Sequence, residues 1–172
     1  QMLSGRDIVG QAQTGTGKTA AFSLPILEQI DPSASHVQAL ILTPTRELAI
    51  QVKEAIRQMS NSRSLYVLTV YGGQSIDRQI QRLKRGVEIV VGTPGRVIDL
   101  LNRGDLKLDQ IKWMVLDEAD EMLSMGFIQD VEKILEAASG ERQTAFFSAT
   151  MDPSVLKLVR KYLKSPVTVK VE

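Results

Sequence analysis

The chain has 172 residues, of which 43% are hydrophobic and 24% charged, a composition typical of a globular domain with one core. Its 21 basic and 20 acidic residues give a formal charge of +1, so any nucleic-acid site must be a local patch. Cysteine is absent, which excludes disulfides and thiolate metal sites, and no segment suggests a membrane span or a signal peptide; we expect a cytoplasmic protein with no membrane partner.

Strand-like and helical patterns alternate along the chain. The expected strands are 7–11, 39–43, 65–70, 88–92, 112–117, 144–148 and 167–171. The expected helices are 19–30, 46–59, 75–84, 96–102, 130–138 and 153–163. Continuous apolar strands that alternate with helices are typical of an α/β fold with a mostly parallel sheet covered on both faces.

The segment between the first strand and the first helix resembles a phosphate-binding loop. It reads Ala12, Gln13, Thr14, Gly15, Thr16, Gly17, Lys18, Thr19. Backbone N–H groups of such a loop and the positive end of the next helix bind a polyphosphate; Lys18 would reach the β and γ phosphates and the Thr19 hydroxyl would hold Mg²⁺. The strict pattern has glycine in place of Ala12, and Gly-Lys-Thr alone could be a turn entering a helix. Both flanks favour the nucleotide site.

Adjacent carboxylates follow the strand 112–117, in the order Asp117, Glu118, Ala119, Asp120. A strand buried on both faces cannot keep these charges in its core, so they must lie at the carboxyl edge of the sheet, where open α/β sheets bind ligands. There Asp117 can hold hydrated Mg²⁺ and Glu118 can orient or deprotonate an attacking water. Acidic residues also suit the start of a helix, but the upstream loop favours the catalytic interpretation.

The loop and the Asp-Glu-Ala-Asp segment, in this order, resemble the DEAD-box ATP-dependent RNA helicases. Further matches are Pro44-Thr45-Arg46-Glu47-Leu48, Gly72-Gly73, Thr93-Pro94-Gly95-Arg96 and Ser148-Ala149-Thr150, and Ala12 is the form that this family uses. The resemblance implies a RecA-like P-loop NTPase fold, with residues 1–172 as the amino-terminal of two RecA-like domains. It also implies ATP and Mg²⁺ as cofactors, and RNA and the second domain as partners.

The resemblance further implies that two parts of a working helicase lie outside this chain. One is the glutamine motif that recognises adenine, because Gln1 stands too close to Gly5 to be that glutamine. The other is the second RecA-like domain, which supplies arginine fingers and half of the RNA clamp. We therefore expect the fragment alone to be a monomer and essentially inactive.

Two similar loops are candidates for RNA contact. Each follows a strand and opens a helix, which offers N–H groups, a hydroxyl and a guanidinium to a phosphate. The expected contacts are made by Pro44, Thr45, Arg46, Thr93, Pro94, Gly95 and Arg96, and by Gly72 and Gly73, whose lack of a side chain would allow close approach. Taken separately these residues could be helix caps and turns. Together they favour sequence-independent binding of the sugar-phosphate backbone.

Ser148 and Thr150 end the strand 144–148 at the same edge. Their hydroxyls could bond the carboxylate of Asp120 and so connect the ATP site to the RNA surface. The alternative is helix capping before Pro153, with Thr150 or Asp152 as the cap. In the family this motif is credited with coupling hydrolysis to unwinding.

Several conspicuous residues favour ordinary structural roles. We expect His36 to be exposed in a loop, and Met122, Met125 and Phe127 to pack the segment after the carboxylates into the core. The basic residues Arg78, Arg82, Lys84 and Arg85, a cluster beside Gly72-Gly73, are expected to form mainly a solvated helix face; the alternative is that some of them touch RNA.

Two other functions stay open at this point. One is a nucleic-acid-binding module without turnover, against which Lys18, Asp117 and Glu118 argue. The other is a DNA helicase of the same superfamily, against which Ala119 and the two Thr-Pro loops argue.

Overall fold

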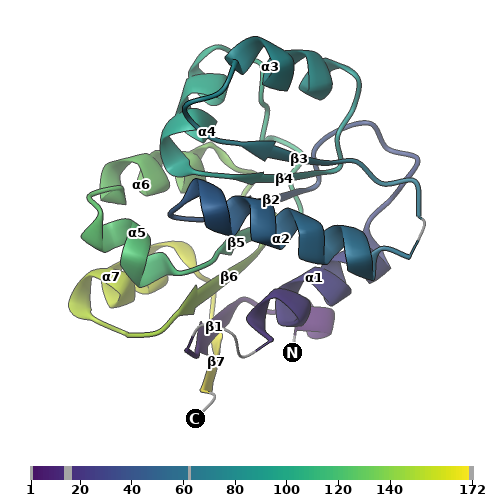
Figure 1. The fold of residues 1–172 in the computed structure, drawn as a ribbon. Helices are drawn as coiled ribbons and strands as arrows, with labels where there is room; N and C mark the ends of the chain where they lie inside the picture. Colours follow the sequence, from purple (N-terminus) through teal and green to yellow (C-terminus); the bar gives the residue numbers. More distant parts are fainter. Residues whose placement is uncertain (1, 14–16, 62, 171–172) are drawn as a thin grey trace.

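The computed structural model describes residues 2–13, 17–61 and 63–170 (Figure 1). It contains one seven-stranded sheet in the order β3-β4-β2-β5-β6-β1-β7, and every strand pair is parallel. The strands are β1 (Ile8–Gln11), β2 (Ala39–Leu42), β3 (Val67–Val70), β4 (Ile89–Gly92), β5 (Trp113–Leu116), β6 (Gln143–Ser148) and β7 (Val167–Lys170). All seven expected strands are present, with ends that differ by one or two residues; the expected end at Val171 lies outside the described residues.

In the described part of the chain, seven α-helices connect the strands and one 3-10 helix precedes β1. They are η1 (Met2–Ser4), α1 (Lys18–Gln29), α2 (Arg46–Met59), α3 (Ile76–Lys84), α4 (Pro94–Asn102), α5 (Ala119–Ser124), α6 (Ile128–Ala137) and α7 (Pro153–Tyr162). The six expected helices are confirmed, whereas η1 and α5 were not among them, because three and six residues are too few to give a periodic pattern. None of the helices in the described ranges is long and apolar enough to cross a membrane.

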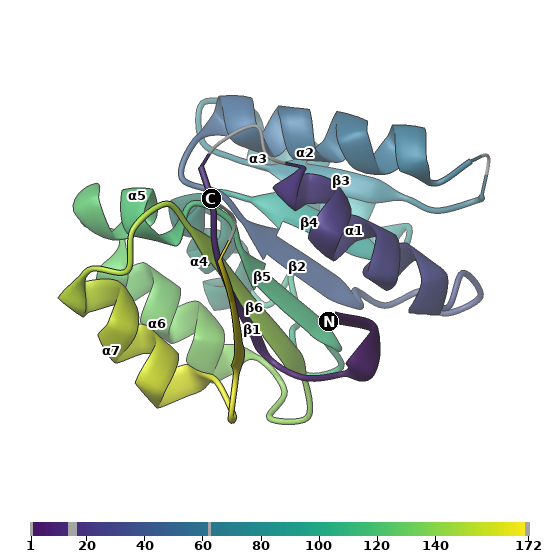
Figure 2. The same cartoon turned by 90° about the horizontal axis from the view of Figure 1, so that it is seen from below.

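Helices cover both faces of the sheet, and Figure 2 shows α1 and α2 on one side and α5, α6 and α7 on the other. Strand side chains alternate between two buried clusters. Leu40 and Leu42 pack toward α3 to α7, whereas Ala39 and Ile41 pack toward α1 and α2. Burial of both faces explains why β2, β4 and β5 are apolar throughout.

The parallel sheet determines where the functional segments gather. All strands point the same way, so the segments after β1, β2, β4, β5 and β6 meet at one carboxyl edge. Gly92 allows β3 and β4 to converge there, because a Cβ at this position would lie 2.9 Å from the carbonyl oxygen of Val70.

Two expectations about packing are wrong. Met125 is 49% exposed, because α5 ends at Ser124 and the chain turns at Gly126, whereas Met122 is fully buried and Phe127 partly buried. His36 is half-buried, because its loop folds back near α3 and borders a groove with Leu83 and Asp105.

Candidate phosphate-binding and RNA-binding site

The phosphate-binding loop joins β1 to α1 at the carboxyl edge of the sheet. The N–H of Ala12 donates to the carbonyl oxygen of Ser148 at 3.1 Å, which fixes the start of the loop beside β6. At its end Gly17 adopts a φ of 78°, which favours glycine, and caps α1, whose first two residues are Lys18 and Thr19. Gln13 is exposed. Three expected phosphate ligands, Thr14, Gly15 and Thr16, lie outside the described residues.

Lys18 and Asp117 meet across this edge. The Nζ of Lys18 lies 3.7 Å from Oδ1 of Asp117, and the two side chains are 9% and 3% exposed. This distance makes an ion pair but exceeds a hydrogen bond, and Oδ1 has no hydrogen-bond partner among the described residues. Burial raises the pKa of Asp117, and the positive charge of Lys18 opposes the rise. An incompletely satisfied buried carboxylate is a favourable place for a cation.

Glu118 follows in an uncommon backbone conformation. Its φ of 54° and ψ of 53° are left-handed, and it forms the N-cap of α5 without a side-chain bond. Such a conformation costs a non-glycine residue on the order of 1 kcal/mol and is found where surrounding structure requires it. Burial, and then the neighbouring charge of Asp117, raise the pKa of Glu118. A half-buried carboxylate with a raised pKa is suited to accept a proton.

The oxygen atoms at this edge suit Mg²⁺, which needs few protein ligands, better than a metal ion that is held by protein side chains alone. No group of three or more His, Asp or Glu side chains able to hold a metal occurs within the described ranges. Mg²⁺ commonly keeps several waters and uses one or two protein oxygens together with substrate phosphates. The unsatisfied Oδ1 of Asp117 matches that requirement.

Asp120 connects this edge to the end of β6. Its Oδ2 accepts hydrogen bonds from the backbone N–H and the hydroxyl of Thr150, both at 3.1 Å. Ser148 acts differently from the expectation: its hydroxyl oxygen accepts a hydrogen bond from the backbone N–H of Asp120 at 3.2 Å, whereas the expected bond had the hydroxyl donating to the carboxylate. Asp152 caps α7 by accepting from the N–H groups of Ser154 and Val155, so the capping alternative is confirmed for Asp152 and wrong for Thr150.

The loops after β2 and β4 differ in how they use threonine. Thr45 caps α2, since its hydroxyl accepts from the N–H of Leu48 at 3.2 Å. Thr93 is the N-cap of α4 without such a bond. The buried rings of Pro44 and Pro94 hold the two loops in place, and Gly95 is exposed.

The two candidate arginines are held by partners that the sequence did not indicate. The guanidinium of Arg46 stacks over the ring of Tyr71, 5.0 Å from its centroid. The NH1 group of Arg96 donates to Gln74 O at 3.2 Å and to Gln79 Oε1 at 3.0 Å. Gln79, buried on α3, also donates to Tyr71 O, so one side chain links both arginine sites; no sequence signal marks a glutamine for this role.

A groove of about 490 Å³ lies beside these loops. It is lined by residues already expected at an RNA site, namely Gly72, Thr93, Gly95 and Arg96, and by residues that were not, Phe127 and Asp130 among them. No heavy atom lies within 4 Å of a Cβ built at Gly72 or Gly73, so the space above this turn is open. Gly73 also needs its positive φ of 82°.

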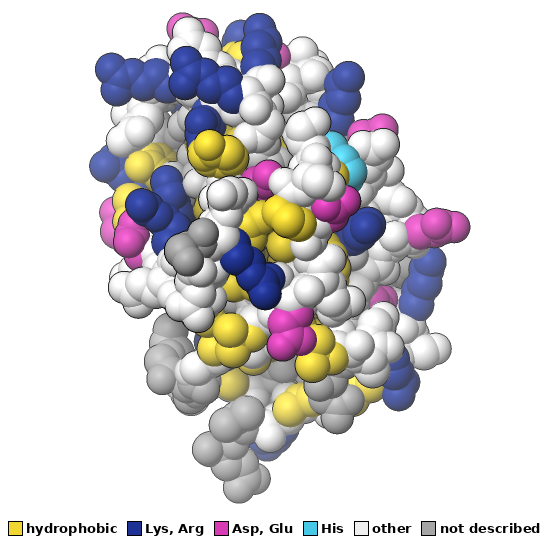
Figure 3. Space-filling view, turned by 90° about the vertical axis from the view of Figure 1, so that its right-hand side faces the viewer, with side chains coloured by type: hydrophobic (Ala, Val, Ile, Leu, Met, Phe, Trp, Pro, Cys, Tyr) yellow, Lys and Arg dark blue, Asp and Glu magenta, His cyan; other side chains and the backbone are white. Residues whose placement is uncertain are grey.

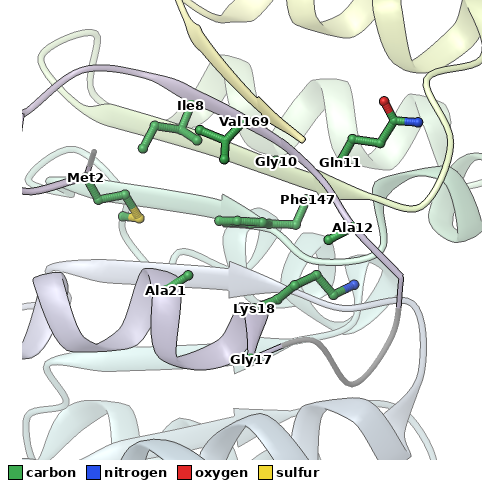
Figure 4. Close-up of a pocket in the computed structure, with 10 residues that line it drawn as sticks. All are labelled: Met2, Ile8, Gly10, Gln11, Ala12, Gly17, Lys18, Ala21, Phe147 and Val169. Carbon is green, nitrogen blue, oxygen red and sulfur yellow. The ribbon is translucent and has the colours of Figure 1, made fainter. Parts of the chain in front are cut away.

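A second cavity, of about 240 Å³, lies between α1 and the strands β1 and β7 (Figure 4). Its walls are mostly apolar, with Met2, Ile8, Phe147 and Val169. Figure 4 shows that the amine of Lys18 points away from Met2 and Ile8, toward the end of the loop. The cavity is thus distinct from the charged edge, although Gly17 and Lys18 border both.

Comparison with known proteins agrees with this geometry. The family model for DEAD/DEAH box helicases matches residues 1–159. The chain belongs to this family. Among relatives of this helicase domain, the RNA helicase CrhR of Synechocystis is 62% identical over 99% of the chain, and the ATP-dependent RNA helicase CshA of Listeria monocytogenes is 54% identical over 99%. The chain spans only 35% and 33% of their lengths.

Solved structures confirm the expected RecA-like fold of this helicase domain. A DEAD box protein from the hyperthermophile Methanococcus jannaschii superposes with a TM-score of 0.96 at 46% identity, over 99% of this chain and 47% of that one. A structure described as a hypothetical ATP-dependent RNA helicase from Sulfolobus tokodaii gives a TM-score of 0.90 at 38% identity, over 99% of this chain and 49% of that one.

Proposed function

We propose that the protein carrying this domain is an ATP-dependent RNA helicase that hydrolyses ATP, binds the RNA sugar-phosphate backbone and unwinds or remodels RNA in the cytoplasm. Residues 1–172 would be one of its two RecA-like domains. The observation that carries the proposal is the meeting of Lys18 and Asp117 at 3.7 Å, with Glu118 beside them and the candidate RNA loops on the same edge.

In the proposed reaction the chain positions a nucleotide and activates water. Lys18 would bind terminal phosphates, and Thr19 and Asp117 would hold Mg²⁺, the Asp through water. When bound, Mg²⁺ supplies charge neutralisation at the phosphates. Glu118, whose raised pKa makes it a better proton acceptor than an exposed carboxylate, would orient the attacking water and take its proton.

RNA would lie against the two loops and the Gly72-Gly73 turn. The N–H groups at the start of α2 and α4 and the guanidinium of Arg96 suit phosphate oxygens. Asp120 would transmit changes at the nucleotide to this surface, because it is hydrogen-bonded to Thr150 on the segment after β6.

The test is an ATPase measurement on the full-length protein with RNA and with DNA of the same sequence. We expect RNA to stimulate hydrolysis and DNA to have little effect. Equal stimulation would favour a DNA helicase, and no hydrolysis under any condition would favour a binding module.

A second measurement tests the division into two domains. The isolated 172-residue chain should neither displace duplex RNA nor turn over ATP at an appreciable rate, because an arginine finger in phosphoryl transfer is worth about 10³ to 10⁵ in rate. ATP-dependent unwinding by the isolated chain would contradict this expectation.

A further inference from the structure

A basic surface lies along the β3 edge of the sheet, outside the loops described above. It consists of Lys53 and Arg57 on α2, Tyr66 just before β3, Arg78 and Arg82 on α3, and Arg85 at the C-cap of α3; we call it the β3-edge surface. In Figure 3, Lys and Arg side chains gather at the top of the molecule, where α3 lies in Figure 1. Its residues come from three segments, so sequence spacing revealed only the basic residues of the α3 segment, and the structure adds those of α2 and Tyr66.

The three arginines of this surface form one stripe. Arg78, Arg82 and Arg85 are spaced by four and three residues, and Arg85 continues the helical conformation at the end of α3. Residues at this spacing share one face of a helix, so the stripe runs from the first turn of α3 to its C-cap. The seven steps from Arg78 to Arg85, at a rise of 1.5 Å each, make its length about 10.5 Å.

An exposed aromatic ring is held within the surface. Tyr66 is 51% exposed, and the guanidinium carbon of Arg82 lies 4.0 Å from its ring centroid. The backbone N–H of Tyr66 donates to Oε2 of the buried Glu88 at 2.7 Å, which fixes the position of this residue. A half-exposed ring stacked with arginine is a feature of surfaces that bind nucleic acid without reading sequence.

The cations of the surface are crowded. Burial and the charges of Arg57 and Arg82 lower the pKa of Lys53, so the charged lysine is destabilised where it stands. Glu54 pairs with Arg57 at 3.6 Å, and Asp77 on α3 adds a second acidic side chain, which leaves an excess of positive charge. A polyanion would relieve this repulsion.

The β3-edge surface adjoins the candidate RNA loops. The first turn of α3 lies against them, since Arg96 bonds Gln74 O and Gln79 Oε1. From there α3 runs back toward the amino end of β3, where Arg82 meets Tyr66. The arginine stripe therefore leads away from the carboxyl edge, in continuity with the loops.

We propose that the β3-edge surface binds the phosphate backbone of RNA that extends beyond the segment held by the loops. The inference rests on the proposed function and deepens it, because it assigns a second, purely electrostatic contact to the same substrate. Its contribution should appear only with RNA long enough to leave the loops, and it should depend strongly on salt.

The test compares two charge-reversal variants of the full-length protein. Arg78→Glu with Arg85→Glu changes two exposed residues of the stripe. Lys133→Glu with Arg160→Glu changes two exposed residues on α6 and α7 by the same total charge, away from α3, and is the matched control. Affinity is measured for hexauridylate and for an oligouridylate three times as long, over a range of salt concentrations.

For the long RNA we expect the stripe variant to lower the slope of log affinity against log salt by about 1.4, because each phosphate contact to single-stranded nucleic acid contributes about 0.7. The ratio of wild-type affinity to variant affinity should therefore fall about sevenfold as the salt concentration rises from about 50 to 200 mM. Hexauridylate binding should match wild type, and the control variant should match wild type with both RNAs.

The outcomes separate this inference from the proposed function. If wild type binds both RNAs but the stripe variant behaves like the control, the β3-edge surface is not an RNA contact. Polyglutamate binding is measured with the same variants, and if the stripe variant loses affinity for polyglutamate but not for RNA, the surface binds an acidic protein and the proposal is overturned. If wild type binds neither RNA, the proposed function itself fails, and this inference with it.

Discussion

The hydrogen bonds between Asp120 and Thr150 should stabilise the folded domain by a measurable amount. Oδ2 of Asp120 accepts two bonds of 3.1 Å, and bonds to charged groups contribute about 1.5 to 3 kcal/mol when buried. Thr150 is exposed, so water competes and we expect about 1 kcal/mol for its hydroxyl. Thr150→Val should therefore cost about 1 kcal/mol, and Asp120→Ala about 2 kcal/mol, because it also removes a carboxylate from the first turn of α5.

A double-mutant cycle isolates the contact. The variant with both changes should lose about 2 kcal/mol rather than about 3, because the hydroxyl bond can be lost only once. Urea unfolding followed by fluorescence provides the measurement, since Trp113 is the single tryptophan and is 5% exposed in the core. Glu121→Ala removes another first-turn acid that has no contact with Thr150 and is the control. Strict additivity for Asp120 and Thr150, or equal coupling for Glu121, would refute the contact.

Three further predictions concern the site and the sheet. Lys18→Ala in the full-length protein should weaken ATP affinity and turnover together, whereas Glu118→Gln should lower turnover about 10²- to 10⁴-fold with ATP affinity nearly unchanged. Equal loss of ATP affinity in both variants would show that the roles given to Lys18 and Glu118 are wrong. The raised pKa of Asp117 favours its protonated form in the fold, so without nucleotide or Mg²⁺ the contribution of Asp117 to stability should be fully present below the ordinary pKa and be lost as pH rises through the raised value. Asp117→Asn should flatten this dependence in urea unfolding, and an unchanged slope would count against the raised pKa. Gly92→Ala should lower the free energy of unfolding by about 2 to 3 kcal/mol, because its Cβ would lie 2.5 Å from a side chain and 2.9 Å from a carbonyl oxygen of β3. The control Gly140→Ala, whose Cβ would have no atom within 4 Å, should change it by less than about 0.5 kcal/mol in the same assay.

The sequence predicted the sheet well because the central strands, such as β2, β4 and β5, are buried on both faces. Segments such as Leu40 to Leu42 are apolar without interruption, and turn or helix signals bound them. The same patterns placed Lys18, Asp117 and Asp120 at one edge, since parallel strands leave no other arrangement for the ends of β1, β5 and β6.

Features that depend on tertiary contacts were not predictable. The direction of the Ser148 hydrogen bond depends on the approach of the backbone of Asp120, which a residue type does not reveal. Gln79 supports Arg96 only because the fold brings α3 close enough to the start of α4 for these two side chains to bond. Met125 carries an apolar side chain that suggested burial, but its exposure is set by the turn at Gly126.

The left-handed backbone of Glu118 has a consequence for the whole acidic segment. By turning the chain abruptly between β5 and α5, this one residue gives three nearby carboxylates separate directions. Asp117 faces Lys18, Glu118 stays half-buried at the corner, and Asp120 reaches across to Thr150. The directions of these three side chains therefore depend on one backbone turn. Removing or inserting one residue within it would misplace all three acids at once, a sensitivity that the local chemistry of any one of them would not suggest.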